Sequence, residues 1–223
     1  MFYKHAINKS KAIFTVSKFS SERIKYHLHP KKPVIITYNS VPEWFIKSEN
    51  INKKNDILFV GNIKKHKGLH ILVQAFNNAM KQGLNANLLI VGNSNNFRSA
   101  DSTIFEEISL NKNIKFTGKI SDEELKNIYE SSRLLVQPSL YEGFGMPPLE
   151  ALTMGTNVLI SDIPVFKEIY KDFPVTYFKS EDVEDLTDKI IDCFNKENPL
   201  NLPEIYSFKR TSDIIIKTIT EGK

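Results

Sequence analysis

Two glutamates, Glu142 and Glu150, stand on either side of a short loop that contains Gly143 and Gly145. A glutamate carboxylate accepts hydrogen bonds from hydroxyl groups, and sugars carry hydroxyls in neighbouring pairs. The two glycines let the backbone bend sharply and allow a ligand to come close to it. The prolines at 147 and 148 predict the start of a helix, which places Glu150 in the first turn of that helix. The segment therefore has the residue types of a site for a hydroxyl-rich ligand.

The same loop is also a candidate site for an anion. The apolar run at 134–136 predicts a buried strand, so the segment is a strand, a glycine loop and a helix in succession. Unpaired backbone N–H groups at such a junction suit a phosphate. A carboxylate repels phosphate, so we expect the two glutamates to bind hydroxyls on either side of it. A nucleotide-sugar has this order of groups, with a diphosphate between two sugars.

A simpler interpretation of these two acids stays open on the residues alone. Glu150 would then only complement the dipole of its helix, and Glu142 would be a solvated loop acid.

A second loop, at 61–68, is basic and reads GNIKKHKG. It is not a P-loop, because the order glycine, lysine and hydroxyl residue is absent. Lysines near the N-terminus of a helix are unfavourable for its dipole, and a bound diphosphate would offset them. Lys67 is the candidate phosphate ligand, with Lys64 or Lys65 as helpers. The alternative is a solvated basic loop.

The elements that must position these loops follow a regular alternation. Short apolar runs predict strands at 56–60, 88–91, 114–117, 134–137, 157–160 and 175–178, and helical patterns lie at 68–81, 104–110, from 121 onward, and at 185–194. This alternation predicts an α/β fold with a doubly wound, Rossmann-like parallel sheet. Ligands of such sheets bind at the carboxyl ends of the strands. Glycines follow four of the predicted strand ends and should converge on one crevice: Gly61, Gly92, Gly118 and Gly143.

The two ends of the chain lie outside this alternation. A strand at 12–16, a helix capped by Ser17 with Phe19, Ile24 and Leu28 on its buried side, and a strand at 33–37 are predicted first. A polar linker follows, and the segment 162–168 is interpreted as a structural strand end. The last helix is predicted at 207–219. We divide the chain into an N-terminal remnant (1–45), a linker (46–55), a Rossmann-like domain (56–198) and a C-terminal crossover helix (199–223).

Composition excludes several classes of function. The 223 residues are 41% hydrophobic and carry a net charge of +4, which suits a globular protein with one sizeable core. No basic tract is interleaved with aromatic residues, so nucleic-acid binding is not expected. The single cysteine, Cys193, is predicted to be buried. No apolar stretch reaches about 20 residues, so we expect a cytoplasmic protein without a membrane span, and peripheral association with the inner face of a membrane stays open.

The whole central segment resembles the signature of the family-4 retaining glycosyltransferases of GT-B fold (glycosyl transferases group 1). The residues that carry the resemblance are Glu142-Gly143-Phe144-Gly145, Pro148, Glu150 and Ala151. The resemblance extends from about Ala12 to about Ile219. It implies that the chain is the C-terminal, donor-binding portion of a GT-B fold, with a residual piece of the N-terminal domain.

The resemblance also implies roles for individual residues. Glu142 would face the transferred sugar and Lys67 would clamp the donor diphosphate, which makes these two the candidate catalytic residues. Asn62 stands where many members have arginine. The remaining predicted donor contacts are Gly118, Lys119 and Ile120 at the nucleobase, Gly143, Phe144, Gly145 and Leu149 in the central segment, and Glu150 on the ribose diol.

The reaction implied is transfer of a hexose from a UDP-, GDP- or ADP-sugar to a glycan or lipid-linked acceptor, in polysaccharide or glycoconjugate biosynthesis. It needs neither a cofactor nor a metal ion. The leaving diphosphate takes the acceptor's proton, so the enzyme supplies electrostatic stabilisation rather than a strong base.

The family's N-terminal glycine-rich loop, and the histidine that contacts the donor sugar, have no counterpart before Ala12. Three hypotheses stay open. The chain is a glycosyltransferase half that works with a separate N-terminal-domain chain or is a fragment of a longer enzyme, a non-catalytic nucleotide-sugar-binding subunit, or an α/β interaction module without a ligand.

Overall fold

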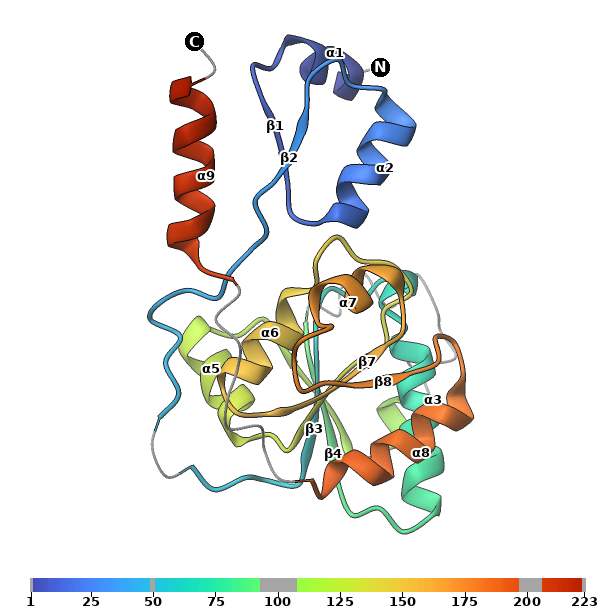
Figure 1. The fold of residues 1–223 in the computed structure, drawn as a ribbon. Helices are drawn as coiled ribbons and strands as arrows, with labels where there is room; N and C mark the ends of the chain where they lie inside the picture. Colours follow the sequence, from blue (N-terminus) through green and yellow to red (C-terminus); the bar gives the residue numbers. More distant parts are fainter. Residues whose placement is uncertain (1, 49–50, 93–107, 197–205, 222–223) are drawn as a thin grey trace.

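The computed structural model describes residues 2–48, 51–92, 108–196 and 206–221. Its larger part is built on one six-stranded sheet in the order β5-β4-β3-β6-β7-β8, with every pair of neighbouring strands parallel (Figure 1). The strands are β3 (Asp56–Val60), β4 (Asn87–Val91), β5 (Ile114–Gly118), β6 (Leu134–Gln137), β7 (Asn157–Ser161) and β8 (Thr176–Phe178). This arrangement confirms the predicted doubly wound, Rossmann-like sheet.

Helices cover both faces of the sheet. One face carries α3 (Leu69–Lys81) and α8 (Val183–Phe194), which pack against each other (Figure 1). The other face carries α5 (Asp122–Ser131), α6 (Met146–Thr153) and α7 (Pro164–Ile169). The N-terminus of α5 has a capping box, in which the side chains of Ser121 and Glu124 each accept a hydrogen bond from the other's backbone N–H.

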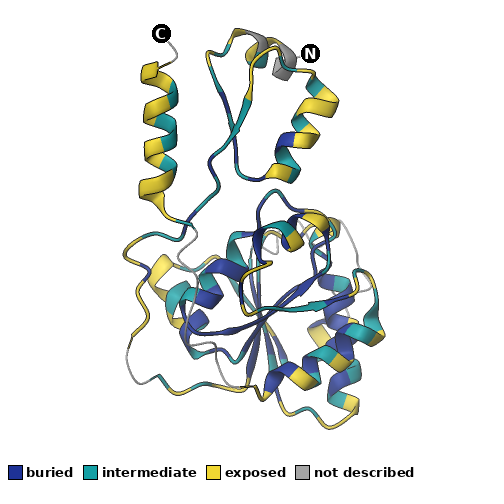
Figure 2. Cartoon of the chain, in the orientation of Figure 1, coloured by how far each residue is buried: buried dark blue, intermediate teal, exposed yellow. Residues whose placement is uncertain are grey.

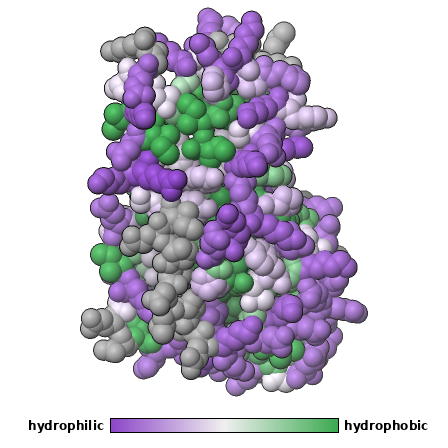
Figure 3. Space-filling view, in the orientation of Figure 1, coloured by the Kyte–Doolittle hydropathy of each residue, from purple (hydrophilic) through white to green (hydrophobic). Residues whose placement is uncertain are grey.

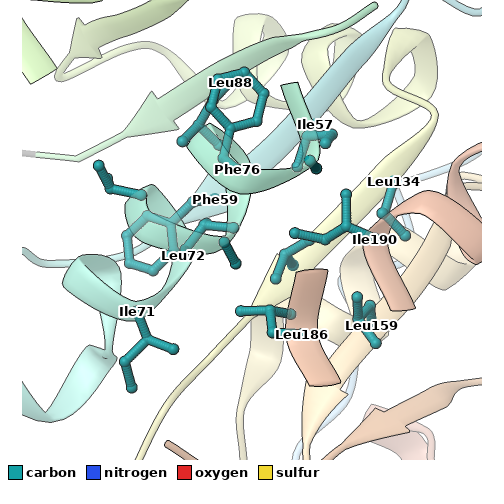
Figure 4. Close-up of a cluster of buried hydrophobic side chains, with 14 of the residues drawn as sticks. Ile57, Phe59, Ile71, Leu72, Phe76, Leu88, Leu134, Leu159, Leu186 and Ile190 are labelled. Carbon is teal, nitrogen blue, oxygen red and sulfur yellow. The ribbon is translucent and has the colours of Figure 1, made fainter. Parts of the chain in front are cut away.

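The two faces correspond to two hydrophobic clusters, because side chains alternate along each strand. In β3, Ile57 and Phe59 belong to the cluster under α3 and α8, whereas Leu58 belongs to the cluster on the other face. Figure 4 shows the first cluster, in which strand residues such as Leu134 and Leu159 meet Leu72 and Phe76 of α3 and Leu186 and Ile190 of α8. Burial is continuous along the central strands and falls off toward the outer sides of the helices (Figure 2).

The strand order reverses between β3 and β6. From β3 the chain runs outward through β4 to β5, and from β6 it runs the other way through β7 to β8. A crevice at the carboxyl ends of the strands is expected at this switch point. The loops at 61–68 and 138–145, which follow β3 and β6, therefore lie where a ligand of such a sheet binds.

A smaller unit precedes this domain. It consists of α1 (Phe2–Lys9), β1 (Ile13–Thr15), α2 (Lys18–Leu28) and β2 (Val34–Ile36), with β1 and β2 paired in parallel. The C-terminal helix α9 (Phe208–Glu221) returns to this unit, where the Thr211 hydroxyl donates to the carbonyl of Thr37 at 2.9 Å (Figure 1). Ser17 caps α2 as predicted, and Phe19, Ile24 and Leu28 are only partly buried.

The segment between the two units is fixed to the larger one. Phe45 is buried with its ring centroid 5.9 Å from that of Tyr129, and the backbone N–H of Ser48 donates to the Glu130 carboxylate at 2.6 Å. Lys53 donates to the Ser132 carbonyl at 2.9 Å. Burial, with the neighbouring charge of Lys47 adding to it, lowers the pKa of Lys53 to about 8. The division of the chain at 45, 55 and 198 stays a prediction.

Some local expectations were wrong or fall elsewhere. The segment at 162–168 is not only a strand end, because α7 begins at Pro164, and α1 had no counterpart among the predicted elements. Most of the helix predicted at 104–110 lies outside the described residues. The part that is described, 108–110, is helical. Cys193 is buried, as predicted. In the described part of the chain, no helix is both long and apolar enough to cross a membrane.

Candidate functional site

The loops after β3 and β6 meet through an ion pair. The Lys67 ammonium lies 2.6 Å from Oε1 of Glu142, and the two side chains are 20% and 10% exposed. Lys67 ends a short 3₁₀ helix (Lys65–Lys67), whose lysines were expected to need an offsetting anion. The structure supplies one in the Glu142 carboxylate. An ammonium has three N–H donors, so Lys67 keeps two for a ligand after it has bound Glu142.

The close approach of the two loops requires a glycine after Lys67. Gly68 has φ +69°, and a Cβ atom there would lie 1.9 Å from the Pro138 carbonyl oxygen. The loops are also joined by a backbone hydrogen bond of 2.8 Å from the Leu140 N–H to the His66 carbonyl. His66 therefore contributes its backbone to the site, and its side chain is exposed.

Within the described part of the chain, Glu142 accepts hydrogen bonds through only one of its two carboxylate oxygens. Oε1 accepts from Lys67 and, at 2.9 Å, from the hydroxyl of Ser139. Among the described residues, none donates a hydrogen bond to Oε2. A carboxylate oxygen without a partner at the edge of a crevice can accept a hydrogen bond from a ligand hydroxyl.

The loop at 143–145 offers backbone donors. In the part of the chain that the structure describes, the N–H groups of Gly143, Phe144 and Gly145 donate no hydrogen bond. Gly145 has φ +85°, and a Cβ atom there would lie 2.4 Å from Cε1 of Phe166. Its carbonyl accepts from the Tyr170 hydroxyl. The loop is thus held in one shape by its carbonyl side, while its N–H groups stay available for an anion.

The helix after this loop begins earlier than predicted. Because Gly145 adopts the left-handed conformation and acts as the N-cap, α6 begins at Met146, one residue before Pro147. No acidic residue stands in the first turn of α6, so the predicted position of Glu150 in that turn was wrong. The helix dipole acts mainly on the first turn. The dipole alone is therefore a weak reason for a carboxylate at position 150.

Glu150 is positioned by a tyrosine that the sequence patterns did not single out. The hydroxyl of Tyr129, which is fully buried on α5, donates to Oε2 of Glu150 at 2.7 Å. Burial raises the pKa of Glu150, while the hydrogen bond from Tyr129 acts in the opposite direction and Asp122 adds to the rise. As with Glu142, no hydrogen bond from another described residue reaches the second oxygen, Oε1. Each acid therefore has one oxygen held by a buried hydroxyl and a second oxygen to which no described residue donates a hydrogen bond.

The other predicted contacts lie around the strand ends in different environments. Asn62 and Lys119 are exposed, and Gly118 and Ile120 are partly buried at the end of β5. Phe144 and Leu149 are buried in the core, at 3% and 6% exposure. These two side chains pack in the hydrophobic core and present little surface to a ligand.

The smaller unit touches the same loop. The hydroxyls of Ser17 and Ser20, at the start of α2, donate to the Gly143 carbonyl at 2.6 and 3.2 Å. The Glu168 carboxylate of α7 accepts from the backbone N–H groups of Lys18 and Phe19 at 2.6 and 2.8 Å. Glu168 thus caps α2, which agrees with the structural role predicted for its segment. The carboxyl ends of the strands face the smaller unit (Figure 1).

No three histidine, cysteine, aspartate or glutamate side chains gather as metal ligands would, within the residues that the structure describes.

Comparisons with known proteins agree with this architecture. The family described as Glycosyl transferases group 1 matches residues 40–209. The O-antigen chain mannosyltransferase RfbU of Salmonella typhimurium is 33% identical over 171 residues. That match covers 74% of this chain and 46% of RfbU, so the chain spans about half the length of this relative.

Two solved structures share the fold. A glycosyltransferase from Rickettsia africae matches 99% of this chain and 62% of its own, with a TM-score of 0.68 and 17% identity. The C-terminal domain of a group 1 glycosyltransferase, LpcC of Francisella tularensis, matches 68% of this chain and 86% of its own, with a TM-score of 0.57 and 23% identity. The chain therefore belongs to the glycosyl transferases group 1, family 4 of the glycosyltransferases, and its six-stranded sheet has the fold of the C-terminal domain of the GT-B architecture.

Proposed function

We propose that this chain binds a nucleotide-diphosphate hexose and acts in the transfer of the hexose to a glycan or lipid-linked acceptor. Membership of the family supports a nucleotide-sugar donor. The observation that carries the proposal is the Lys67–Glu142 pair at the switch point of the sheet, which lies beside three loop N–H groups that have no partner among the described residues.

The charges of the site fit the order of groups in such a donor. The diphosphate takes the N–H groups of residues 143–145 and the two remaining donors of Lys67. Oε2 of Glu142 accepts from a hydroxyl of the transferred sugar, and Oε1 of Glu150 accepts from the ribose. Asn62 adds a neutral donor to the diphosphate, and the backbone from Gly118 through Lys119 to Ile120 meets the base.

The proposed reaction breaks the bond between the anomeric carbon and the diphosphate oxygen, and an acceptor hydroxyl attacks on the same face of the sugar. The departing diphosphate oxygen takes the proton of that hydroxyl, so every atom and charge is accounted for. The chain contributes donors fixed in advance where negative charge develops on the leaving group, which is the largest effect in many enzymes.

A hexose such as mannose is the donor sugar that the RfbU similarity favours, and polysaccharide biosynthesis is the process. We place the reaction in the cytoplasm, at the inner face of the membrane when the acceptor is lipid-linked.

A thermal-shift screen of UDP-, GDP- and ADP-sugars, followed by calorimetric titration of the best ligand, tests the proposal. We expect the melting temperature to rise with one nucleotide-sugar, and Lys67→Ala and Glu150→Gln each to weaken its binding about tenfold or more. Lys81→Ala removes an exposed positive charge from α3 and is the control for net charge. Lys64→Ala tests whether a neighbouring lysine shares the phosphate. A protein that no nucleotide-sugar stabilises would overturn the proposal in favour of an interaction module without a ligand.

We expect catalysis to need a second half of the site, and two exposed apolar surfaces support a place of attachment on the smaller unit. The residues of β2, Val34, Ile35 and Ile36, are apolar yet all partly exposed, whereas a parallel strand is normally covered on both faces. The helix α9 has no buried residue although its apolar side chains lie on one face. Figure 3 shows hydrophobic side chains gathered over β1 and β2, beside α9. We propose that an N-terminal GT-B domain, in the same polypeptide or in a separate chain, extends the sheet of β1 and β2.

An experiment with an added N-terminal half distinguishes the catalytic proposal from the alternative of a non-catalytic nucleotide-sugar-binding subunit. Transfer of the hexose from the identified donor to an added glycan or lipid-linked acceptor is measured with this chain alone and with an N-terminal half added. Turnover only in the mixture would support the catalytic half. Tight donor binding without turnover in either sample would support the non-catalytic subunit.

A further inference from the structure

A row of buried polar side chains leads from the end of β6 to Glu142. The side-chain amide of Gln137 donates to the Ser139 hydroxyl at 3.0 Å, and that hydroxyl donates to Oε1 of Glu142 at 2.9 Å. Gln137 and Ser139 are both 0% exposed. The other residues of β6 are leucine and valine, so these polar groups stand in an apolar setting where burial costs free energy unless every group is hydrogen-bonded.

The number of hydrogen atoms on each group determines which partner donates in the two hydrogen bonds of Ser139. A serine hydroxyl has one hydrogen, and an ionised carboxylate only accepts. Ser139 must therefore give its hydrogen to Glu142 and accept one from Gln137. The NH₂ group of Gln137 then faces Ser139, and its carbonyl oxygen points away.

That carbonyl oxygen is left without a partner. Within the described residues, Gln137 Oε1 is the buried side-chain polar atom to which no hydrogen bond is donated. An unpaired buried acceptor destabilises a fold, and a methionine of similar shape would avoid this effect. The stability of the sheet therefore does not explain a glutamine at this position, whereas the orientation of Ser139 does.

The backbone of Ser139 is held as well. The hydroxyl of Ser161, at the end of β7 and also 0% exposed, donates to the Ser139 carbonyl at 2.5 Å. Ser139 is thus fixed from β6 and from β7 at once. Its hydroxyl and Lys67 together occupy Oε1 of Glu142, and no described residue donates a hydrogen bond to Oε2.

We propose that Gln137 and Ser139 are positioning residues, which sort the two carboxylate oxygens of Glu142 into one that holds Lys67 and one that accepts a hydroxyl of the bound sugar. The inference deepens the proposed function and rests on it for its ligand. Neither residue touches the sugar, and both act through Glu142.

The test combines stability, binding and a double-mutant cycle. Ser139→Ala and Gln137→Met are compared with Thr187→Val, which removes a buried hydroxyl on α8 that bonds to the Val183 carbonyl at 2.7 Å, far from these loops. We expect Ser139→Ala to weaken binding of the identified nucleotide-sugar about tenfold, Gln137→Met to weaken it less, and Thr187→Val to leave it unchanged. Gln137→Met should keep or raise the melting temperature, because it removes the unpaired acceptor.

The cycle separates positioning from a general structural role. In a Glu142→Gln background, Ser139→Ala should cause little further loss of affinity, because the group through which it acts is gone. Equal losses in both backgrounds, or a fall in melting temperature that accounts for the loss of binding, would overturn the inference.

Crystal structures determined without a ligand test the inference independently of the proposed function. Crystal structures of Ser139→Ala and Gln137→Met should show the Glu142 carboxylate displaced from Lys67, whether or not the wild-type chain binds a nucleotide-sugar. An unchanged 2.6 Å ion pair in both variants would contradict the positioning role even if donor binding were confirmed.

Discussion

The ammonium of Lys67 and the carboxylate of Glu142 lie 2.6 Å apart, although 75 positions separate them in the chain. The two residues follow β3 and β6, the strands between which the order of the sheet reverses. An ion pair at this point places a cation and a carboxylate side by side, and in the proposed function these two groups bind the phosphate and a sugar hydroxyl. Both side chains are mostly buried, so each depends on the other for compensation of its charge.

Breaking this pair from either side should destabilise the fold more than removing both charges. Lys67→Met or Glu142→Gln alone leaves one mostly buried charge without its partner, whereas the double variant leaves none. We expect the double-mutant cycle to give a favourable coupling of about 1 kcal/mol or more in the free energy of unfolding, measured by urea denaturation. Additive effects of the two substitutions would show that the pair contributes nothing to stability.

As the pH is lowered, binding of the donor should weaken at a higher pH than it would if Glu150 had the pKa of an ordinary glutamate. Burial raises the pKa of Glu150 above its usual 4.5, and in the proposed site the ribose hydroxyl donates to the ionised form of this carboxyl. Affinity should therefore be full above the raised pKa and fall as the pH drops through it. A nucleotide-sugar is the right probe, because its diphosphate does not titrate in this range.

The variant Tyr129→Phe sharpens this pH test. The hydrogen bond from Tyr129 lowers the pKa of Glu150, so its removal should shift the midpoint of the binding curve to a higher pH. Glu150→Gln should bind more weakly and without the transition. A wild-type curve of the same shape as that of Glu150→Gln would contradict the assignment to this carboxyl.

The two glycines of the central loop should tolerate alanine very differently. At Gly145 a Cβ atom would lie 2.4 Å from Phe166 at φ +85°, whereas at Gly143 the nearest atom, Oγ of Ser20, would be 3.6 Å away. We expect Gly145→Ala to lower the free energy of unfolding by about 1–3 kcal/mol or more, and Gly143→Ala to change it by less than about 1 kcal/mol. Equal melting temperatures for the two variants would show that the loop does not require its left-handed glycine.

Lys53 should make the protein more stable in mild alkali. Its pKa is about 8 in the folded protein against the usual 10.5, because burial disfavours the charged form. Between these two values the unfolded chain binds more protons than the folded one, so stability rises with pH. The neutral amine still donates to the Ser132 carbonyl and the Thr156 hydroxyl.

The measurement for Lys53 is the difference between wild type and Lys53→Met in the free energy of unfolding across this range of pH. The difference cancels the ionisation of tyrosines in the unfolded chain. We expect the wild type to gain stability relative to Lys53→Met as the pH rises above about 8. A constant difference would indicate that Lys53 titrates with its ordinary pKa.

The strands of the larger domain were predictable because they are short, continuously apolar and mostly followed by glycine. The run at 134–137 illustrates the limit of this signal. Its leucines and valine predict a buried strand that ends at Gln137, and a polar residue at the end of a buried strand is the sequence signal that could have identified this glutamine. Its hydrogen bond to Ser139 is visible only in the structure.

The partners of the two glutamates were not predictable from spacing. Tyr129 precedes Glu150 by 21 positions and lies on another helix, so only the packing of α5 on α6 brings them together.

The helix carrying Glu150 was predicted to begin one residue too late, because the prolines indicated a start that the left-handed Gly145 shifts to Met146. The helix α7 was missed since its six residues are too few to show a helical period.

The most direct test of the central claim is an amide NMR titration of the chain with the nucleotide-sugar found in the thermal-shift screen. If the loop N–H groups bind the diphosphate, the amide signals of Gly143, Phe144 and Gly145 should show the largest downfield shifts, and Lys67→Ala should reduce them. Binding of the same ligand with no shift at these three amides, and with its largest shifts elsewhere in the chain, would contradict the account.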